Sequence, residues 1–409
     1  MKNYFAFLLL MLIAQTAMNQ SLDYYLEIAL QKNPDLKAAY FSFEAQLEKV
    51  EQVKFLVNPT LGFGYFISPI ETRLGSQQTK ISLSQIFPWF GTLSAKKDVA
   101  SLMAAAQFEE FRNKQALLAF EVKTAYYKYL EALELLEIHQ QNLSIVKSHA
   151  NMAKIAYSNG KSKNTEIFEA NLMLDEITSN IYILNKRLNL LKKSFNRLLN
   201  RSDSLEITAA TLAVPIDFEI NEDPDSLLSN HPKLTALEKQ MAAAIIDENV
   251  VRKNGFPQIG LGFDYMIIQP LDGPTIKNNG KDALMPIFSL SLPIFRKKYQ
   301  SQTREIRLYQ KQLEAQKIQL QNTLAIEWIS TQNQRFESKA QYDLNKQRIQ
   351  NANQEINFAL NNLKNDNINF KNILESQNNL LKFKLSQVTW KRNYAEAMAK
   401  TTYLISKEL

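Results

Sequence analysis

Large apolar residues alternate with small or polar ones, with a period of two, along four short segments of the chain. The apolar positions are Leu61, Phe63, Tyr65 and Ile67; Ile81, Leu83 and Phe87; Ile259, Leu261, Phe263, Tyr265 and Ile267; and Phe288, Leu290, Leu292 and Ile294. The residues between them are mostly Gly and Ser. This alternation predicts β-strands, and an aromatic-rich face opposite a small, polar one suits strands whose outer side touches lipid. The sequence therefore predicts two β-hairpins, at 59–88 and 257–295.

Elsewhere apolar residues recur three and four positions apart. The longest regular run is Ile167, Ala170, Leu174, Ile177, Ile181, Leu184, Leu188, Leu191, Phe195 and Leu198. A sustained average spacing of 3.5 residues between apolar positions is typical of left-handed coiled coils. The chain has only ten Gly and twelve Pro among 409 residues, so long stretches lack a helix breaker. We expect long helices over about 22–56, 95–157, 163–200, 233–254, 297–362 and 368–407.

The order of these features occurs twice. Four segments have counterparts in the same order in the second half: 33–36 with 231–234, 59–65 with 257–263, 82–90 with 289–295, and 167–171 with 373–377. Each half then contains a helix, a hairpin and two long helices. This predicts a first repeat at 18–200, a polar connector at 201–226 and a second repeat at 227–409.

The N-terminus has the pattern of a secretory signal peptide. Lys2 precedes an apolar run that ends near Ala14, followed by small and polar residues, so residues 1–17 are the expected signal. No later stretch approaches the roughly 20 apolar residues of a membrane-spanning helix. Strands would therefore have to carry the protein into a membrane.

Four strands cannot close a barrel, and an open sheet in hydrocarbon would leave edge N–H and C=O groups without partners. Several chains must then pool their strands. Three chains would supply about twelve, within the range of outer-membrane barrels, although this argument does not fix the number three uniquely. The predicted fold is mainly α with a membrane β-barrel, internally duplicated, in which a twelve-stranded barrel joins a long coiled-coil tunnel.

Composition excludes several other classes of function. The net charge is +7, but acidic and basic residues are interleaved, so no basic stripe indicates nucleic-acid binding. The absence of Cys excludes thiol catalysis and disulfides. His139, His149 and His231 lack metal-pair spacing and are expected to have structural roles. We expect no catalytic residue, metal or cofactor.

Several short motifs carry a resemblance to a known family. They are Asn33-Pro34-x-Leu36, the hairpin starts at Pro59 and Pro257, Tyr157-Ser158-Asn159-Gly160, and the segments that begin at Ile167 and Ile373. In this order and duplication the chain resembles the TolC-like family of outer-membrane efflux proteins. The resemblance implies a homotrimer in outer-membrane lipid with a tunnel in the periplasm. It also implies a periplasmic adaptor and an inner-membrane transporter as partners, in tripartite efflux or type I secretion.

The resemblance also implies functional residues at the helix–turn–helix tips, 157–163 and 363–369. The adaptor-docking candidates are Asn159, Gly160, Lys161, Asn365 and Asp366. The alternative is that Gly160 only ends a helix and the others form a polar loop.

The family's paired acidic residues at the tunnel constriction correspond to Asn372 and Glu375, and Glu169 is equivalent to Glu375 in the first half. Only Glu375 of that pair keeps a charge. Three copies of it would form a ring that favours cations; the alternative is an ordinary solvated glutamate.

Two other classes of protein remain open. A periplasmic coiled-coil scaffold without a pore would explain the helices and the signal peptide, but not the matched strands. A secreted enzyme would need a catalytic constellation that the sequence does not indicate. Fractionation discriminates, because a scaffold stays soluble whereas a channel needs detergent.

Overall fold

The computed structural model describes residues 22–160, 163–208, 212, 224–273, 277–364 and 370–406. The expected signal peptide, 1–17, lies outside these residues, as does most of the expected connector. In chain order the elements are α2 (Leu22–Lys32), α3 (Pro34–Gln52), β1 (Thr60–Thr72), β2 (Gly75–Phe87), α4 (Thr92–Ser158), α5 (Asn164–Leu198), α6 (Pro224–Ser229), α7 (Pro232–Asn254), β3 (Gln258–Gln269), β4 (Ala283–Ser291), α8 (Arg296–Lys364) and α9 (Phe370–Leu404). The protein is thus mainly helical with a four-stranded antiparallel sheet, as predicted.

The predicted helix over 22–56 was wrong as a single element, because it breaks at Asn33-Pro34 into α2 and α3. Proline has no N–H to donate and clashes with the preceding turn. The Oδ1 of Asn33 accepts hydrogen bonds from the backbone N–H groups of Asp35 (2.9 Å) and Leu36 (3.1 Å), which caps the start of α3. The Asn-Pro pair therefore marks a helix boundary.

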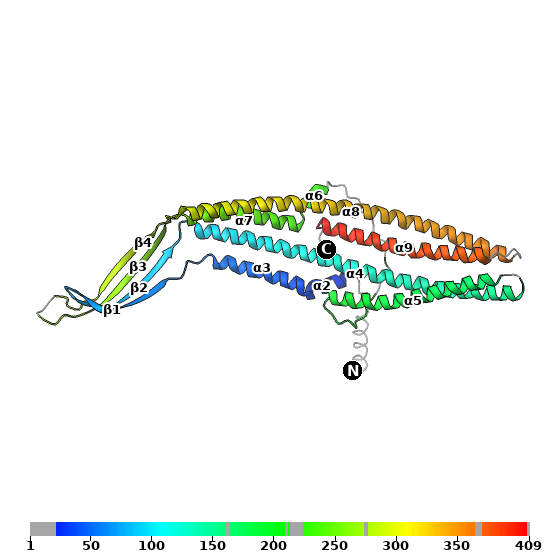
Figure 1. The fold of residues 1–409 in the computed structure, drawn as a ribbon, viewed down its shortest axis with the longest axis horizontal. Coiled ribbons are helices and arrows are strands. Elements are labelled where there is room, and N and C mark those ends of the chain that lie inside the picture. The colour runs from blue at the N-terminus through cyan, green and yellow to red at the C-terminus, as the bar shows by residue number, and fades with distance from the viewer. Residues whose placement is uncertain are drawn as a thin grey trace, which may run out of the picture. The chain divides into compact units, whose positions relative to one another are not determined.

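The chain divides into two compact units, which we describe separately. The sheet unit comprises Ala39–Phe111 and Pro232–Gln321. Its strands are ordered β1-β2-β3-β4, so the two hairpins join through β2 and β3 (Figure 1). Aromatic contacts hold α3 to the start of α4, with Phe43 and Phe108 ring centroids 5.2 Å apart. Ion pairs hold α7 to the start of α8, including Arg307 with Glu248 at 3.0 Å.

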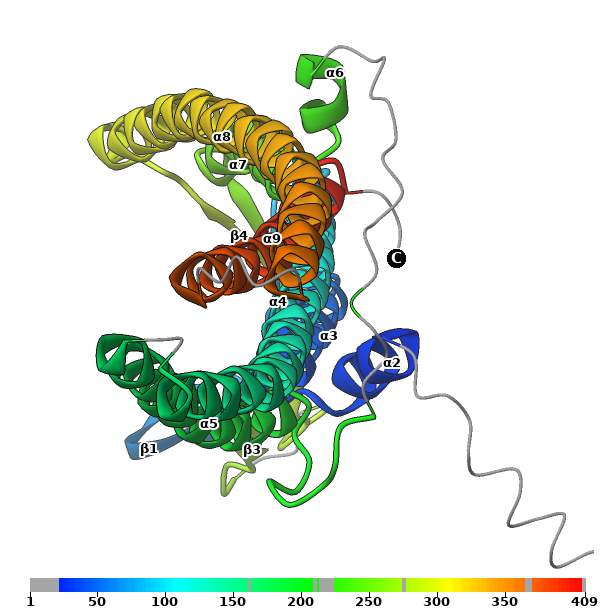
Figure 2. The ribbon, with the colours of Figure 1, turned by 90° about the vertical axis from the view of Figure 1, so that its right-hand side faces the viewer.

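The helix-tip unit comprises Arg112–His231 and Asn322–Leu409, with the residues up to Ala38. Figures 1 and 2 show α5 beside the end of α4, and α9 beside the end of α8. One buried cluster joins Ala150 and Ala153 of α4 to Ala170 of α5 and Leu374 of α9. A second joins α8 and α9 through Ala352, Ile356 and Leu380. None of the helices that the structure describes is both long and apolar enough to cross a membrane.

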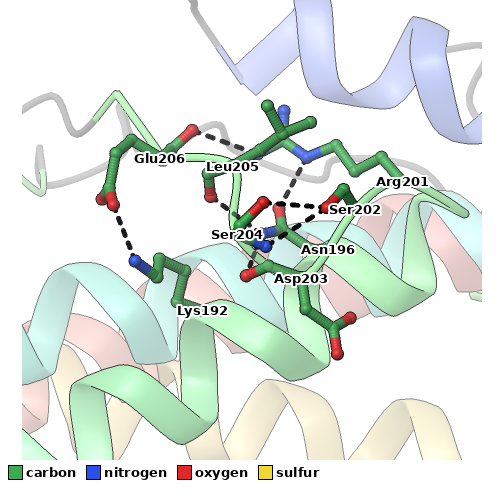
Figure 3. Close-up of polar contacts among 8 residues, drawn as sticks. All are labelled: Lys192, Asn196, Arg201, Ser202, Asp203, Ser204, Leu205 and Glu206. Carbon is green, nitrogen blue, oxygen red and sulfur yellow. Dashed lines mark hydrogen bonds and ion pairs between the residues drawn. The ribbon is translucent and has the colours of Figure 1, made fainter.

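A polar loop after α5 fastens that helix to α2 (Figure 3). Arg201 donates to the Oδ1 of Asn196 at 2.6 Å, and its guanidinium lies 4.9 Å from the ring centroid of Tyr25. The side-chain amide of Asn196 donates to the carbonyl oxygens of Asp203 and Leu205. Arg201 thus hydrogen-bonds to Asn196 and covers the ring of the fully buried Tyr25, so it holds the loop in place at the end of α5.

Candidate functional site

The apolar side chains of the sheet lie in rows that cross all four strands. Phe63, Ile81, Tyr265 and Leu284 are paired in register, and so are Leu61, Leu83, Phe263 and Pro286. These side chains are largely exposed on the single chain, for example Phe63 at 74% and Leu284 at 66%. Such a broad apolar face is unusual in a water-soluble surface. The strand register therefore confirms that the predicted apolar residues of the strands share one face, on which Gln85 also lies. The predicted fourth strand was too long, since Leu292 and Ile294 lie beyond the end of β4.

The opposite face carries small residues and one ion pair. Gly62, Ser82 and Asp264 are paired across three strands. The Asp264 side chain is almost fully buried, and Lys80 and Ser82 of β2 contact its carboxylate. Gly262 allows this close packing, since a Cβ there would lie 2.6 Å from the carbonyl oxygen of Leu83. Met266, Met285 and Ile287 also lie on this face, so it combines a buried ion pair and small residues with a few apolar side chains.

Both edges of the sheet are open within the part of the chain that the structure describes. β1 pairs only with β2 and β4 only with β3. The backbone groups along the outer sides of β1 and β4 then depend on water or on another chain. An apolar face with two open edges is the central structural feature of the sheet unit.

The α4–α5 turn places two of the predicted tip residues at an exposed end of the helix-tip unit. Gly160 has φ +70°, the left-handed conformation that ends a helix, and its N–H donates to the carbonyl oxygen of Tyr157 at 2.9 Å. Nothing lies within 4 Å of a Cβ built on Gly160. Asn159 is likewise exposed. Lys161, Asn365 and Asp366 lie outside the described residues.

The predicted constriction residues lie within the first two turns of α5 and α9. Glu169, Asn372 and Glu375 are all exposed, whereas the intervening Ile373 is buried. Asn372 and Glu375 therefore share a helix face. Ala170 follows Glu169, and Leu374 precedes Glu375. Both Ala170 and Leu374 belong to the same buried cluster, so packing holds the backbone beside each acidic residue.

A polar seam between α4 and α9 was not expected from the sequence. The side-chain amide of Gln377 donates to the Oδ1 of Asn142 at 2.7 Å, and both residues are buried. Further along, Lys391 pairs with Glu134 at 2.7 Å. Glu131, whose side chain is only 4% exposed, lies 3.5 Å from Arg392. The available signal was polar residues at helix-interior positions, but their pairing depends on the packing register.

The three histidines are buried at separate places. Burial lowers the pKa of His139 and of His149 on α4, and for His139 the carboxylate of Glu176 opposes the shift. His231 lies edge-on to the ring of Tyr403, with centroids 5.5 Å apart. Among the residues that the structure describes, no group of three or more His, Asp or Glu side chains could hold a metal ion.

Comparison with known proteins connects these features. The sequence profile of the outer membrane efflux protein family matches residues 25–184. The fold resembles the outer-membrane channel OprN, with 16% identity, a TM-score of 0.76, and coverage of 95% of this chain and 90% of that one.

Two further channels of known structure have the same fold. VceC from Vibrio cholerae has 16% identity and a TM-score of 0.76, over 94% of this chain and 95% of that one. The open state of MtrE from Neisseria gonorrhoeae has 16% identity and a TM-score of 0.76, over 94% of this chain and 88% of that one. A sequence comparison with curated proteins gave no match. The family profile matches residues 25–184, and the chain shares its fold along nearly its whole length with these outer-membrane proteins.

Proposed function

We propose that three copies of the chain form a passive exit duct, with a twelve-stranded barrel in the outer membrane and a helical tunnel in the periplasm. The observation that carries this proposal is the four-stranded sheet with one apolar face and two open edges. In hydrocarbon each unpaired edge group costs several kcal/mol. Edge-to-edge pairing of β4 of one copy with β1 of the next removes every open edge when the ring closes.

The helix-tip unit supports the same head-to-tail assembly. Apolar side chains are exposed on α5 at Phe168, Ile183 and Leu190, and on α8 at Phe358, Leu344 and Phe336. With a rise of 1.5 Å per residue, these lie roughly 6, 28 and 39 Å from the start of α5 and roughly 9, 30 and 42 Å from the end of α8. The two faces therefore match in level, and α5 of one copy can pack on α8 of the next.

Charged residues on the two faces also correspond. Lys186 and Lys193 of α5 are at the levels of Asp343 and Glu337 of α8, by the same arithmetic. A contact between two different surfaces of one chain is heterologous, and such contacts close into rings when the rotation allows. The duct would then be walled by α4, α5, α8 and α9 of each copy.

The division into repeats at 18–200 and 227–409, with a signal peptide at 1–17 and a connector at 201–226, is part of this proposal. So are the roles of the tip residues. Asn159, Gly160 and Lys161 would dock a periplasmic adaptor together with Asn365 and Asp366. Glu375, with Asn372 and Glu169, would line the narrowest part of the tunnel. Cargo would be driven by an inner-membrane transporter, in tripartite efflux or type I secretion.

Planar-bilayer recording on the purified protein tests the duct. We expect discrete conductance steps from a species with the mass of a trimer. A water-soluble monomer without conductance would contradict the proposal and favour the periplasmic scaffold.

Adaptor docking is tested with cysteine cross-linkers, since the chain has no native Cys. Asn159→Cys and Asn365→Cys should cross-link to a co-expressed periplasmic adaptor, whereas Lys37→Cys should not. Equal labelling at all three positions would argue against docking at the tips.

A further inference from the structure

The four places where strands join helices share an unusual composition. In each, an exposed or half-buried aromatic side chain stands next to cations on the helix side. The aromatic residues are Phe55, Trp89, Phe90, Phe256 and Phe295, and the cations are Lys54, Lys96, Lys97, Arg252, Lys253, Arg296, Lys297 and Lys298. We call this set the junction belt. All four junctions lie at the same end of the sheet (Figure 1).

The junction belt carries a strong, one-sided charge. Its four segments, 52–58, 88–97, 252–258 and 291–299, contain eight cations and no acidic residue. Within the part of the chain that the structure describes, Lys54 and Arg252 are the cations of these segments that form ion pairs, with Glu51 and Glu248 just outside the segments. At the opposite end of the sheet, segments 70–76 and 269–282 contain three cations and three acidic residues. The two ends of the strands thus differ in charge although both would lie at a membrane surface.

Contacts within the junction belt hold its parts together. Trp89 stacks on Phe256, with centroids 5.1 Å apart. Lys253 donates to the carbonyl oxygen of Gly91 at 3.1 Å, and Arg296 to that of Gly255 at 2.9 Å. These carbonyl contacts position the cations without neutralising them. Phe90 and Phe295 remain 76% and 79% exposed beside them.

Aromatic side chains at the boundary of the hydrocarbon anchor a protein at the headgroup level, and clustered cations there attract anionic lipids. We propose that the junction belt binds the headgroups of anionic phospholipids, such as phosphatidylglycerol, in the leaflet from which the helices emerge. This rests on the proposed duct, because it requires the sheet to span a bilayer. Three copies would surround the barrel with a continuous cationic ring at one membrane surface only.

The test uses the full-length protein reconstituted in phosphatidylcholine bilayers with spin-labelled lipids. Electron paramagnetic resonance measures the relative association of labelled phosphatidylglycerol and labelled phosphatidylcholine with the protein. We expect wild type to prefer phosphatidylglycerol over phosphatidylcholine roughly two- to fivefold. One cation near an anionic surface contributes about 1 kcal/mol, which corresponds to about a factor of five in relative association. The preference should weaken in about 1 M salt, where screening acts within about 3 Å.

The belt variant combines Lys54→Gln, Lys97→Gln, Lys297→Gln and Lys298→Gln. A matched control replaces four exposed lysines elsewhere, at positions Lys37, Lys154, Lys239 and Lys311. The proposal expects the preference to disappear in the belt variant and to persist in the control. It is overturned if wild type shows no preference, if the belt variant keeps it, or if both variants lose it equally.

Conductance of the same samples separates this inference from the duct itself. If pores form without lipid preference, only the junction-belt proposal fails. If no sample conducts, the duct proposal fails, whatever the lipid measurement gives.

Discussion

The sheet and the helix-tip unit arrange polar and apolar side chains in opposite ways. In the sheet most aromatic residues share one exposed face, and the buried charge, Asp264, lies on the other face opposite Ser82 and Met285. In the helices alanine and leucine form the interior, yet charged pairs such as Lys391 with Glu134 are enclosed among them. The proposed duct accounts for this difference, because it places lipid around the sheet and water around the helices.

The largest expected effect comes from placing a charge on the outward face of the sheet. Phe263→Arg should destabilise the assembled protein by about 2–4 kcal/mol, the cost of arginine at the lipid face of a barrel near mid-depth. Ile245→Arg on α7 is the matched control, since Ile245 is 63% and Phe263 44% exposed on the single chain. In water the control should cost below about 0.5 kcal/mol.

Denaturant unfolding from phospholipid vesicles measures both variants. Equal and small effects would mean that the sheet faces water, and the comparison of two solvents would fail.

Much of this contrast is encoded in sequence patterns. The period-two alternation predicted both hairpins and the face on which Phe63 and Phe263 lie, because neighbouring side chains on a strand must point to opposite sides. The average spacing of 3.5 residues between apolar positions predicted the long helices, because side chains three and four positions apart lie on the same face of a helix. Local rules of this kind need no knowledge of the partner segment.

Features that depend on a partner were not predictable. Gln377 and Asn142 are separated by more than 200 residues, and only the axial register of α9 on α4 brings them within 2.7 Å. The break at Asn33 does have a sequence signal, since Pro34 stands in a polar run over residues 31–35, but the predicted helix over 22–56 did not use it. The roles of the tip residues depend on assembly, which a single chain does not contain.

The second effect concerns the buried seam of the helix-tip unit. Lys391→Met should cost about 2 kcal/mol, because it leaves the partly buried Glu134 without its cation; the value lies between those for exposed and for buried pairs. The side chains of Lys391 and Glu134 are 11% and 28% exposed. Combining Lys391→Met with Glu134→Leu should recover most of the loss.

Lys339→Met is the control for this seam, since the Lys339–Asp343 pair is 38% and 50% exposed. It should cost less than about 1 kcal/mol. Guanidinium unfolding midpoints in detergent give all three values. If the double variant is as unstable as Lys391→Met, loss of packing rather than an unpaired carboxylate explains the effect.

A smaller effect should appear as a pH dependence of the same unit. Burial lowers the pKa of His139 and His149 below the ordinary 6.5. Below about pH 6.5 the unfolded chain therefore binds protons that the folded chain does not, so the free energy of unfolding falls as the pH falls. Each histidine can contribute at most about 1.4 kcal/mol per pH unit.

Unfolding measured between pH 7.5 and 5 should show a shallower loss for His139→Gln with His149→Gln than for wild type. An unchanged slope would assign the acid sensitivity to other groups, including carboxylates of the seam.

The smallest effect is expected at an exposed charge near the start of α9. Glu375 is exposed on the second turn of α9, so Glu375→Gln should change the free energy of unfolding by less than about 0.5 kcal/mol. In a trimer three such carboxylates would face one narrow lumen and raise the local concentration of cations. Their loss should lower the cation-to-anion permeability ratio by less than about fivefold, because a unit charge contributes about 1 kcal/mol at a few ångströms in water. Reversal potentials in asymmetric salt measure this ratio, and Glu305→Gln on the sheet-unit part of α8 serves as control. Equal ratios in wild type and Glu375→Gln would show that Glu375 is an ordinary surface glutamate that does not set ion selectivity.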